Sequence, residues 1–182
     1  HYKRSSKRSR CGESLMPRET FIEILGLKDL DRAGWLRSGL TDVESVAAHS
    51  WGVAFLAFHL CPEELDRTRL LEMAICHDVA EVKVGDITPH DGISPEEKVA
   101  METKAMLEIS SKLPRGQEML ELYKEYEAGV SPEARFLKLC DKLDMALQSY
   151  EYQNRTDVDL SNFRKTANRL VIEFGFPHLL RN

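Results

Sequence analysis

The spacing of apolar residues most constrains the fold, because the chain after its first segment repeats with a helical period. Three apolar faces stand out, made by Phe21, Ile24, Leu25, Leu27 and Leu30, then by Val46, Val53, Phe55, Leu56 and Leu60, then by Leu70, Leu71, Ala74 and Ile75. Side chains three and four positions apart share one side of an α-helix. No run alternates with the period of two that marks a β-strand. The pattern predicts an all-α single domain, a bundle of about seven or eight helices.

Proline and its neighbours predict where several helices begin. Ser94-Pro95 with Glu97 has the form of an N-cap, a first helical residue and a capping-box acid. Ser131-Pro132 repeats this form later in the chain. Pro62, followed by two glutamates, predicts a helix that starts there and continues through residues 77–78. The other predicted features are a loop over residues 84–94, marked by Gly85, Pro89 and Gly92, and a last helix from near Asp159 to Gly175.

Length and charge limit the classes of function. A chain of 182 residues typically forms one domain with a full hydrophobic core. Residues 1–16 hold five basic side chains and one acidic, so the net charge of −5 leaves −9 on residues 17–182. An acidic body argues against a nucleic-acid partner, which needs clustered Lys and Arg. We expect the basic segment 1–16 to be disordered or left from an expression tag.

The cysteines and the hydropathy point to a cytoplasmic protein. Cys11, Cys61, Cys76 and Cys140 form no CxxC pair, and the last three lie in apolar helical runs, where we expect packed, reduced thiols. No apolar run has the length needed to span a bilayer, and no signal-peptide pattern opens the chain. We therefore expect no membrane partner.

The pair His77-Asp78 is the strongest candidate for a reactive site. On a helix, Glu81 lies four positions after His77 and three after Asp78, so the three side chains converge. His49 and Asp141, from separate helices, would complete a set of two imidazoles and two carboxylates. Such a set suits one divalent transition metal, Mn, Co, Ni, Fe or Zn, and suits Mg less well. Spacing alone leaves this site and the alternative, ordinary hydrogen-bonded or solvated side chains, equally open.

The text around this pair resembles the HD-domain superfamily of metal-dependent phosphohydrolases. The similarity rests on His49, then AICHDVAE, VGDITP and KLCDKLDMAL, and on the RxGW segment Arg32–Trp35. It spans roughly residues 25–153 and is closest to the 5′-deoxynucleotidase branch. It identifies residues 17–182 as an HD domain, often homodimeric in this family.

The resemblance implies a role for each matching residue. His49, His77, Asp78 and Asp141 would bind the metal, and Glu81 would act as an acid or base or position water. Asp86 would lie opposite the metal near the scissile phosphate. The implied substrate contacts are Arg32 to phosphate, with Arg37 as a substitute, Trp35 to the sugar, and Glu125 to sugar or water, with Glu127 as a competitor.

These roles predict an enzyme that removes phosphate from (deoxy)nucleoside 5′-monophosphates through attack of a water bound to the metal. Two alternatives remain open. One is an HD hydrolase of another nucleotide: a triphosphate, a cyclic nucleotide or guanosine tetraphosphate. The other is a catalytically weak module that binds nucleotide.

Overall fold

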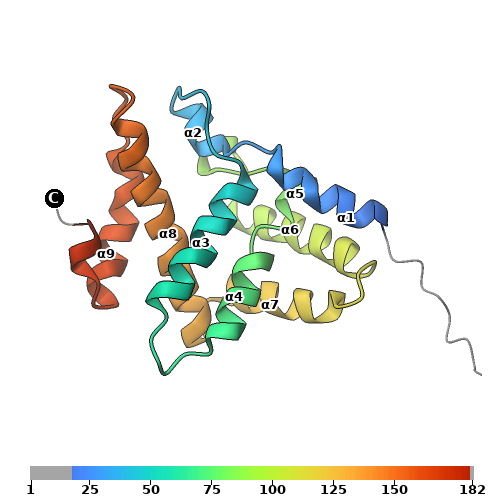
Figure 1. The fold of residues 1–182 in the computed structure, drawn as a ribbon. Coiled ribbons are helices and arrows are strands. Elements are labelled where there is room, and N and C mark those ends of the chain that lie inside the picture. Colours follow the sequence, from blue (N-terminus) through green and yellow to red (C-terminus); the bar gives the residue numbers. More distant parts are fainter. Residues whose placement is uncertain (1–17, 181–182) are drawn as a thin grey trace, which may run out of the picture.

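A computed structural model of the chain describes residues 18–180, which form helices and no strand, as predicted (Figure 1). The longer helices are α1 (Arg18–Leu25), α3 (Val46–Leu60), α4 (Arg67–Cys76), α6 (Pro95–Ser110), α7 (Gly116–Ala128), α8 (Pro132–Gln153) and α9 (Lys165–Glu173). The shorter ones are α2 (Ala33–Arg37) and α5 (Glu81–Val84), with 3₁₀ turns at Gly26–Lys28, Pro89–Asp91, Ser161–Arg164 and Pro177–Leu180. The predicted tail, residues 1–16, lies outside the described residues. Among those described, no helix is long and apolar enough to cross a membrane.

Side-chain caps fix the starts of α3, α4, α6 and α8. Ser94 and Glu97 form the predicted capping box at the start of α6, and Pro95 is the first helical residue. Ser131 accepts a hydrogen bond from the backbone N–H of Ala134 at the start of α8. Both caps satisfy N–H groups that have no partner inside the helix.

The prediction of a helix starting at Pro62 is wrong. That helix, α4, begins at Arg67, because the Asp66 carboxylate accepts from the Arg69 N–H and caps it there. Pro62 instead opens a turn, closed by a hydrogen bond from the Leu65 N–H to the Pro62 carbonyl. The position of the Asp66 cap, and not the position of Pro62, therefore determines where α4 begins.

The helix through His77 and Asp78 is also interrupted, contrary to prediction. α4 ends at Cys76, and residues 77–80 form a tight turn before α5. The N–H of Glu81 bonds to the carbonyl of Asp78, three residues back rather than four. The reactive pair therefore lies at a break between two helices.

Two long helices form the centre of the molecule. α3 and α8 lie side by side in Figure 1, and α4 packs against both of them. The largest apolar core joins α3, α4, α7, α8 and α9 through side chains such as Leu70, Phe136 and Leu143. A smaller cluster of Trp35, Tyr152 and Leu160 attaches α2 to the end of α8. The metal-ligand candidates lie on the elements that these cores hold.

Several residues of the predicted apolar faces point outward. Phe21 and Leu25 on α1, Phe55 on α3 and Ile75 on α4 are exposed, Ile75 by 68%. Phe55 lies beside two other exposed aromatic residues of α3, Trp51 and Phe58. These three residues are called the α3 aromatic stripe. Apolar identity alone did not show which side of a helix faces the core.

The cysteines that the structure describes are free. Cys76 and Cys140 are buried, and Cys61 is half-buried at the end of α3. Cys11 lies outside the described residues. The thiols on α4 and α8 pack in the core, where burial raises the pKa of Cys76 to about 11.

Candidate active site

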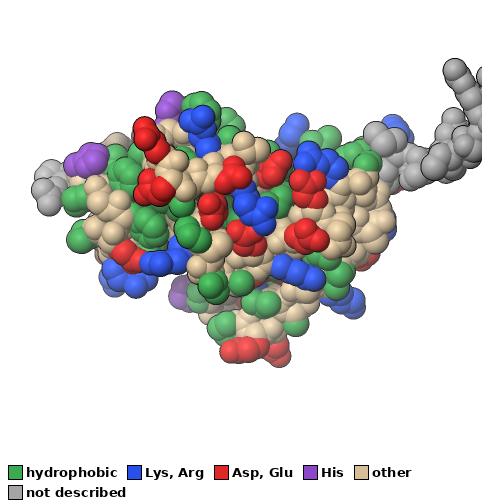
Figure 2. Space-filling model, turned by 90° about the horizontal axis from the view of Figure 1, so that it is seen from below, with side chains coloured by type: hydrophobic (Ala, Val, Ile, Leu, Met, Phe, Trp, Pro, Cys, Tyr) green, Lys and Arg blue, Asp and Glu red, His purple; other side chains and the backbone are tan. Residues whose placement is uncertain are grey.

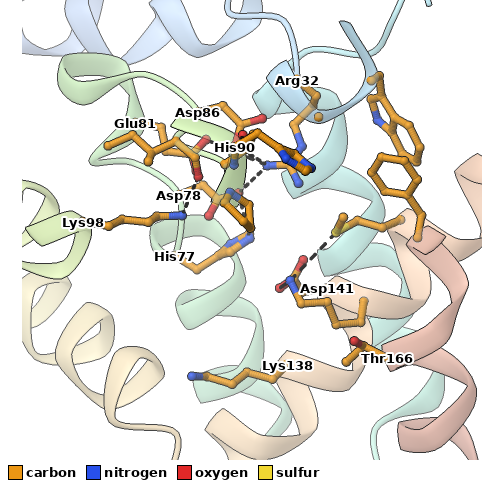
Figure 3. A pocket seen from close by; sticks show the side chains of 18 of the residues that line it. Arg32, His77, Asp78, Glu81, Asp86, His90, Lys98, Lys138, Asp141 and Thr166 are labelled. Atoms are coloured by element: carbon orange, nitrogen blue, oxygen red, sulfur yellow. Dashed lines mark hydrogen bonds and ion pairs between the residues drawn. The ribbon is translucent and has the colours of Figure 1, made fainter. Parts of the chain in front are cut away.

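Three elements bring the predicted metal ligands together. His49 lies in the first turn of α3. His77 and Asp78 lie in the turn after α4, and Asp141 lies midway along α8 (Figure 3). Asp78 Oδ2 is 3.2 Å from His77 Nε2 and 3.7 Å from His49 Nε2, and Asp141 Oδ1 is 3.4 Å from His49 Nε2. Ligand atoms of His49, His77 and Asp78 all lie within 4.8 Å of one another. Side chains that are far apart in the sequence thus meet at one point.

Both imidazoles turn the same nitrogen toward this point. The Nδ1 of His77 lies 2.7 Å from the Ala74 carbonyl oxygen, and the Nδ1 of His49 lies 2.7 Å from Asp144 Oδ2. Their Nε2 atoms are buried and have no hydrogen-bond partner. Buried polar atoms without a partner are rare in folded proteins. Two of them facing one carboxylate fit a bound divalent cation, since imidazole and carboxylate are suitable ligands.

The charges around His49 also favour a cation at this place. Burial and Arg32 lower the pKa of His49, but its contacts with Asp141 and Asp144 outweigh them and raise it to about 9. Burial raises the pKa of Asp78, yet the nearby histidines and Arg32 hold it below its ordinary value. The site therefore stabilises positive charge among ionised carboxylates.

Asp141 has a partner that the sequence analysis missed. The hydroxyl of Tyr126, on α7, donates a 3.0 Å hydrogen bond to Asp141 Oδ2. The same oxygen is 3.0 Å from the Lys142 ammonium. These contacts engage Oδ2 and leave Oδ1 on the side of His49. Nothing in the spacing of Tyr126 relative to Asp141 marks this contact in the sequence.

Glu81, Asp86 and Arg32 form a second group beside the ligands. Arg32 Nη1 lies 3.4 Å from Asp86 Oδ1, 3.7 Å from Asp78 Oδ2 and 3.9 Å from Glu81 Oε2. Asp86 Oδ2 accepts from the Ala33 N–H at 2.8 Å, which fixes the start of α2. The predicted phosphate contact and the two predicted catalytic carboxylates are thus brought together.

Glu81 has the most altered acidity of this group. Its side chain is buried, and Oε2 has no hydrogen-bond partner. Burial, with the charges of Asp78 and Asp86, raises the pKa of Glu81 well above its ordinary value, although Arg32 opposes this. A carboxyl poised to hold or release a proton is typical of acid–base sites.

Trp35 is a core residue and a wall of the cavity at once. It is 1% exposed, packs against Phe163 with 4.1 Å between the centroids of the tilted rings, and donates from Nε1 to Glu44 Oε1 at 2.9 Å. Arg37 points elsewhere in the same cavity, where it bonds to Thr88 and Asp91. Of the two arginines, Arg32 is therefore the one beside the ligands.

The structure does not bring Glu125 to the cavity, contrary to prediction. Its carboxylate pairs with Arg69 and accepts from the Ser131 hydroxyl, on the outer side of α7. Tyr126 and Glu127 line the cavity instead. Successive residues on a helix point about 100° apart, so an uncertainty of one or two residues reverses the direction of a side chain.

One cavity of about 1100 Å³ is lined by Arg32, His77, Asp78, Glu81, Asp86 and Asp141, whereas His49 is buried and does not line it. α2 and the loop over residues 86–90 form one wall, and α8 and α9 form another. Four basic residues that the sequence analysis did not single out also line it: Lys98, Lys138, Lys142 and Arg169. Cavities of this size hold small-molecule ligands, and the cations and carboxylates suit a phosphorylated one.

Comparison with known proteins places the chain in a family. Residues 24–178 match the HD domain model. The chain therefore belongs to the HD-domain family.

Similar proteins indicate which branch of the HD-domain family the chain resembles. The 5′-deoxynucleotidase hdd1 of Schizosaccharomyces pombe is 39% identical over 152 residues, covering 79% of this chain and 77% of the relative. The 5′-deoxynucleotidase HDDC2 of Homo sapiens is 39% identical over 137 residues, covering 74% and 67%. The crystal structure of PH0347 from Pyrococcus horikoshii OT3 superimposes with a TM-score of 0.74 at 30% identity, covering 88% of this chain and 98% of that one. The predicted resemblance to the 5′-deoxynucleotidase branch is confirmed.

Proposed function

We propose that the chain is a metal-dependent phosphohydrolase that releases phosphate from deoxynucleoside 5′-monophosphates. The relatives support the reaction, since curated proteins 39% identical to the chain are 5′-deoxynucleotidases. The observation that carries the site is the pair of buried, unpartnered Nε2 atoms of His49 and His77 beside Asp78. With Asp141 these residues would hold one divalent ion, Mn, Co, Ni, Fe or Zn, with Mg as a weaker candidate.

A divalent ion held by these residues would offset charge on a phosphate oxygen and lower the pKa of a water. Arg32 adds a planar guanidinium that bonds to the other phosphate oxygens. Its proximity to Asp78 and Asp86 keeps it within reach of a phosphate held at the ligands.

Glu81 transfers the proton that the leaving O5′ atom of the nucleoside receives. Water attacks phosphorus, the bond from phosphorus to O5′ breaks, and the nucleoside leaves with a proton on O5′. The raised pKa of Glu81 supports its role as the group that holds or delivers this proton. Asp86 supports the reaction by positioning Arg32 and the first N–H of α2, and is a second candidate for orienting the attacking water.

Trp35 contacts the sugar of the substrate. Phe163 and the hydrogen bond to Glu44 hold the Trp35 ring in place. Glu127, which lines the cavity, replaces Glu125 as the acidic contact with sugar or water. The volume of the cavity also admits a larger nucleotide. Triphosphates and cyclic nucleotides therefore belong in the first assay.

The test is phosphate release from a panel of deoxy- and ribonucleoside 5′-monophosphates, with dNTPs and a cyclic nucleotide alongside. Metal-stripped protein receives Mn, Co, Mg, Ni or Zn singly, and His77→Ala, purified identically, controls for contaminating phosphatases. We expect metal-dependent release from deoxynucleoside monophosphates. Turnover of triphosphates or cyclic nucleotides alone would overturn the substrate and keep the metal site. If metal-loaded protein released phosphate from none of these substrates, the alternative of a catalytically weak module that binds nucleotide would be favoured.

We also propose that the protein is a homodimer joined through the α3 aromatic stripe. Trp51, Phe55 and Phe58 are exposed by 68, 50 and 49%, and the Trp51 and Phe55 rings stack at 5.3 Å. Contiguous apolar surface of this kind commonly marks an interface.

We propose a cytoplasmic protein that binds no nucleic acid. The free, buried thiols of Cys76 and Cys140 support a reducing compartment. The −9 charge of residues 17–182 opposes phosphate backbones. On the face in Figure 2, Lys and Arg lie among Asp and Glu rather than in one basic area.

A further inference from the structure

The His49 ring lies between two carboxylates of one helix. Asp141 Oδ1 is 3.4 Å from its Nε2, and Asp144 Oδ2 is 2.7 Å from its Nδ1. Residues 141 and 144 are one turn apart on α8, so both point toward α3. Asp141 lies on the Nε2 side of the ring, toward His77 and Asp78, and Asp144 lies on the Nδ1 side.

The contact with Asp144 determines which nitrogen carries hydrogen. A carboxylate oxygen accepts, so in the neutral His49 ring Nδ1 carries the hydrogen that is donated to Asp144 and Nε2 keeps a free lone pair. His77 is oriented in the same way by the Ala74 carbonyl, also at 2.7 Å. Both Nε2 atoms then present lone pairs to the ligand site, where they have no other partner.

Gly52 makes room for this arrangement. It lies on α3 three residues after His49, and a Cβ atom there would be 2.0 Å from Asp144 Oδ1 and 2.9 Å from its Cγ. Glycine within a helix costs about 0.5–1 kcal/mol relative to alanine. The close approach of the carboxylate gives a physical reason for glycine at this position.

We propose that Asp144 is a positioning residue for the metal ligand His49, and that Gly52 admits its carboxylate. Asp144 accepts the Nδ1 hydrogen, holds the ring against rotation and increases the basicity of Nε2. Partners of this kind behind a metal ligand typically change metal affinity about 10–100-fold. The inference rests on the proposed role of His49 as a metal ligand.

The first test measures Mn²⁺ and Co²⁺ affinity by calorimetry in Asp144→Ala, Asp144→Asn and Gly52→Ala. We expect Asp144→Ala and Gly52→Ala each to weaken binding about 10–100-fold. Asp144→Asn should lose less, since its amide oxygen still accepts from Nδ1. Asp29→Ala and Gly26→Ala are controls, because Asp29 is exposed and a Cβ at Gly26 meets only Val82, at 3.4 Å. Wild-type affinity in folded Asp144→Ala would overturn the proposal.

A second test separates positioning from a loss of stability. Nitrogen NMR of the metal-free protein, at a pH where the same spectra show the His49 ring to be neutral, should show hydrogen on Nδ1 in wild type and a mixture of tautomers in Asp144→Ala. If Asp144→Ala does not fold, the same spectrum of Gly52→Ala decides, since it displaces the carboxylate without removing it. An unchanged tautomer in Gly52→Ala, with unchanged affinity, would overturn the proposal.

The double variant Gly52→Ala/Asp144→Ala tests whether the two residues act through one contact. Residues in contact depart from additivity. We expect the double variant to bind metal no more weakly than the weaker single variant, and additive losses would contradict the shared contact. His49→Ala tests the underlying proposal: retained metal there would reject the ligand set, whereas lost metal there with full affinity in Asp144→Ala would reject only the role of Asp144.

Discussion

At the scale of single residues, Glu81 differs from the other carboxylates of the cavity. Asp78 and Asp141 are held ionised by neighbouring positive charge, whereas burial and two nearby carboxylates raise the pKa of Glu81. Groups pushed in opposite directions within one site can divide the work between binding charge and moving protons. We propose that Asp78 and Asp141 bind metal and that Glu81 transfers the proton.

This division predicts that Glu81→Gln lowers kcat by about 10²–10⁴-fold while the metal content stays at the wild-type level. The amide matches the carboxyl in size but cannot exchange the proton. Phosphate release and elemental analysis of the same preparation measure both quantities. Glu125→Gln is the matched control, since the Glu125 carboxylate pairs with Arg69 outside the cavity, and its kcat should be unchanged. Equal kcat in the two variants would remove Glu81 from the mechanism.

At the scale of elements, the turn between α5 and the following loop determines where Asp86 lies. Gly85 has φ 80° and ψ 167°, a conformation that is essentially restricted to glycine. This turn directs Asp86 to the Ala33 N–H and to Arg32. The backbone conformation of Gly85 therefore determines whether Asp86, which follows α5, can reach the start of α2.

We expect Gly85→Ala to lower the free energy of unfolding by about 1–3 kcal/mol and to reduce kcat/KM as well. Urea unfolding and steady-state kinetics measure the two effects. Gly175→Ala is the matched control: Gly175 also has a positive φ, 82°, an added Cβ there would have nothing within 4 Å, and the residue does not line the cavity. It should lose stability and keep kcat/KM. A parallel fall in kcat/KM for both variants would show that the turn acts through stability alone.

At the scale of the whole molecule, the ligand site joins three parts of the chain that are distant in sequence. α3, the turn after α4, and α8 each contribute at least one ligand candidate. An ion that binds only this folded arrangement stabilises it by mass action. Metal binding and global stability should therefore be linked.

Metal at about 100 times its Kd should stabilise the stripped protein by about 2.7 kcal/mol, a rise in Tm of roughly 5–10 °C. Calorimetric melts with and without Mn²⁺ or Co²⁺ measure this shift. His77→Ala should show almost none of it, and His178→Ala, at an exposed residue, should show all of it. A full shift in His77→Ala would place the metal elsewhere.

The proposed homodimer makes a prediction at the same scale. Trp51→Glu puts a charge in the α3 aromatic stripe and should convert a dimer into a monomer in light scattering coupled to size exclusion. Val130→Glu, at another exposed apolar position (79%), is the control and should remain dimeric. A wild-type monomer at micromolar concentration would reject the dimer outright.

The amino-acid sequence by itself determined the helical class, the capped starts at Ser94 and Ser131, and the order of the motif residues. These depend on periodicity and on side chains that act within one turn, so they are local. The motif also predicted correctly that His49, His77 and Asp78 lie together, because it identifies a family with a shared fold.

Only the tertiary structure decided which side of each helix meets which neighbour. Glu125 turned to Arg69 and Tyr126 to Asp141, although they are adjacent in the chain. Asp144 and Gly52, unremarkable in the sequence, meet because α3 and α8 pack closely at that level. A helix rotates by about 100° per residue, so the direction of a side chain depends on long-range packing that no local pattern encodes.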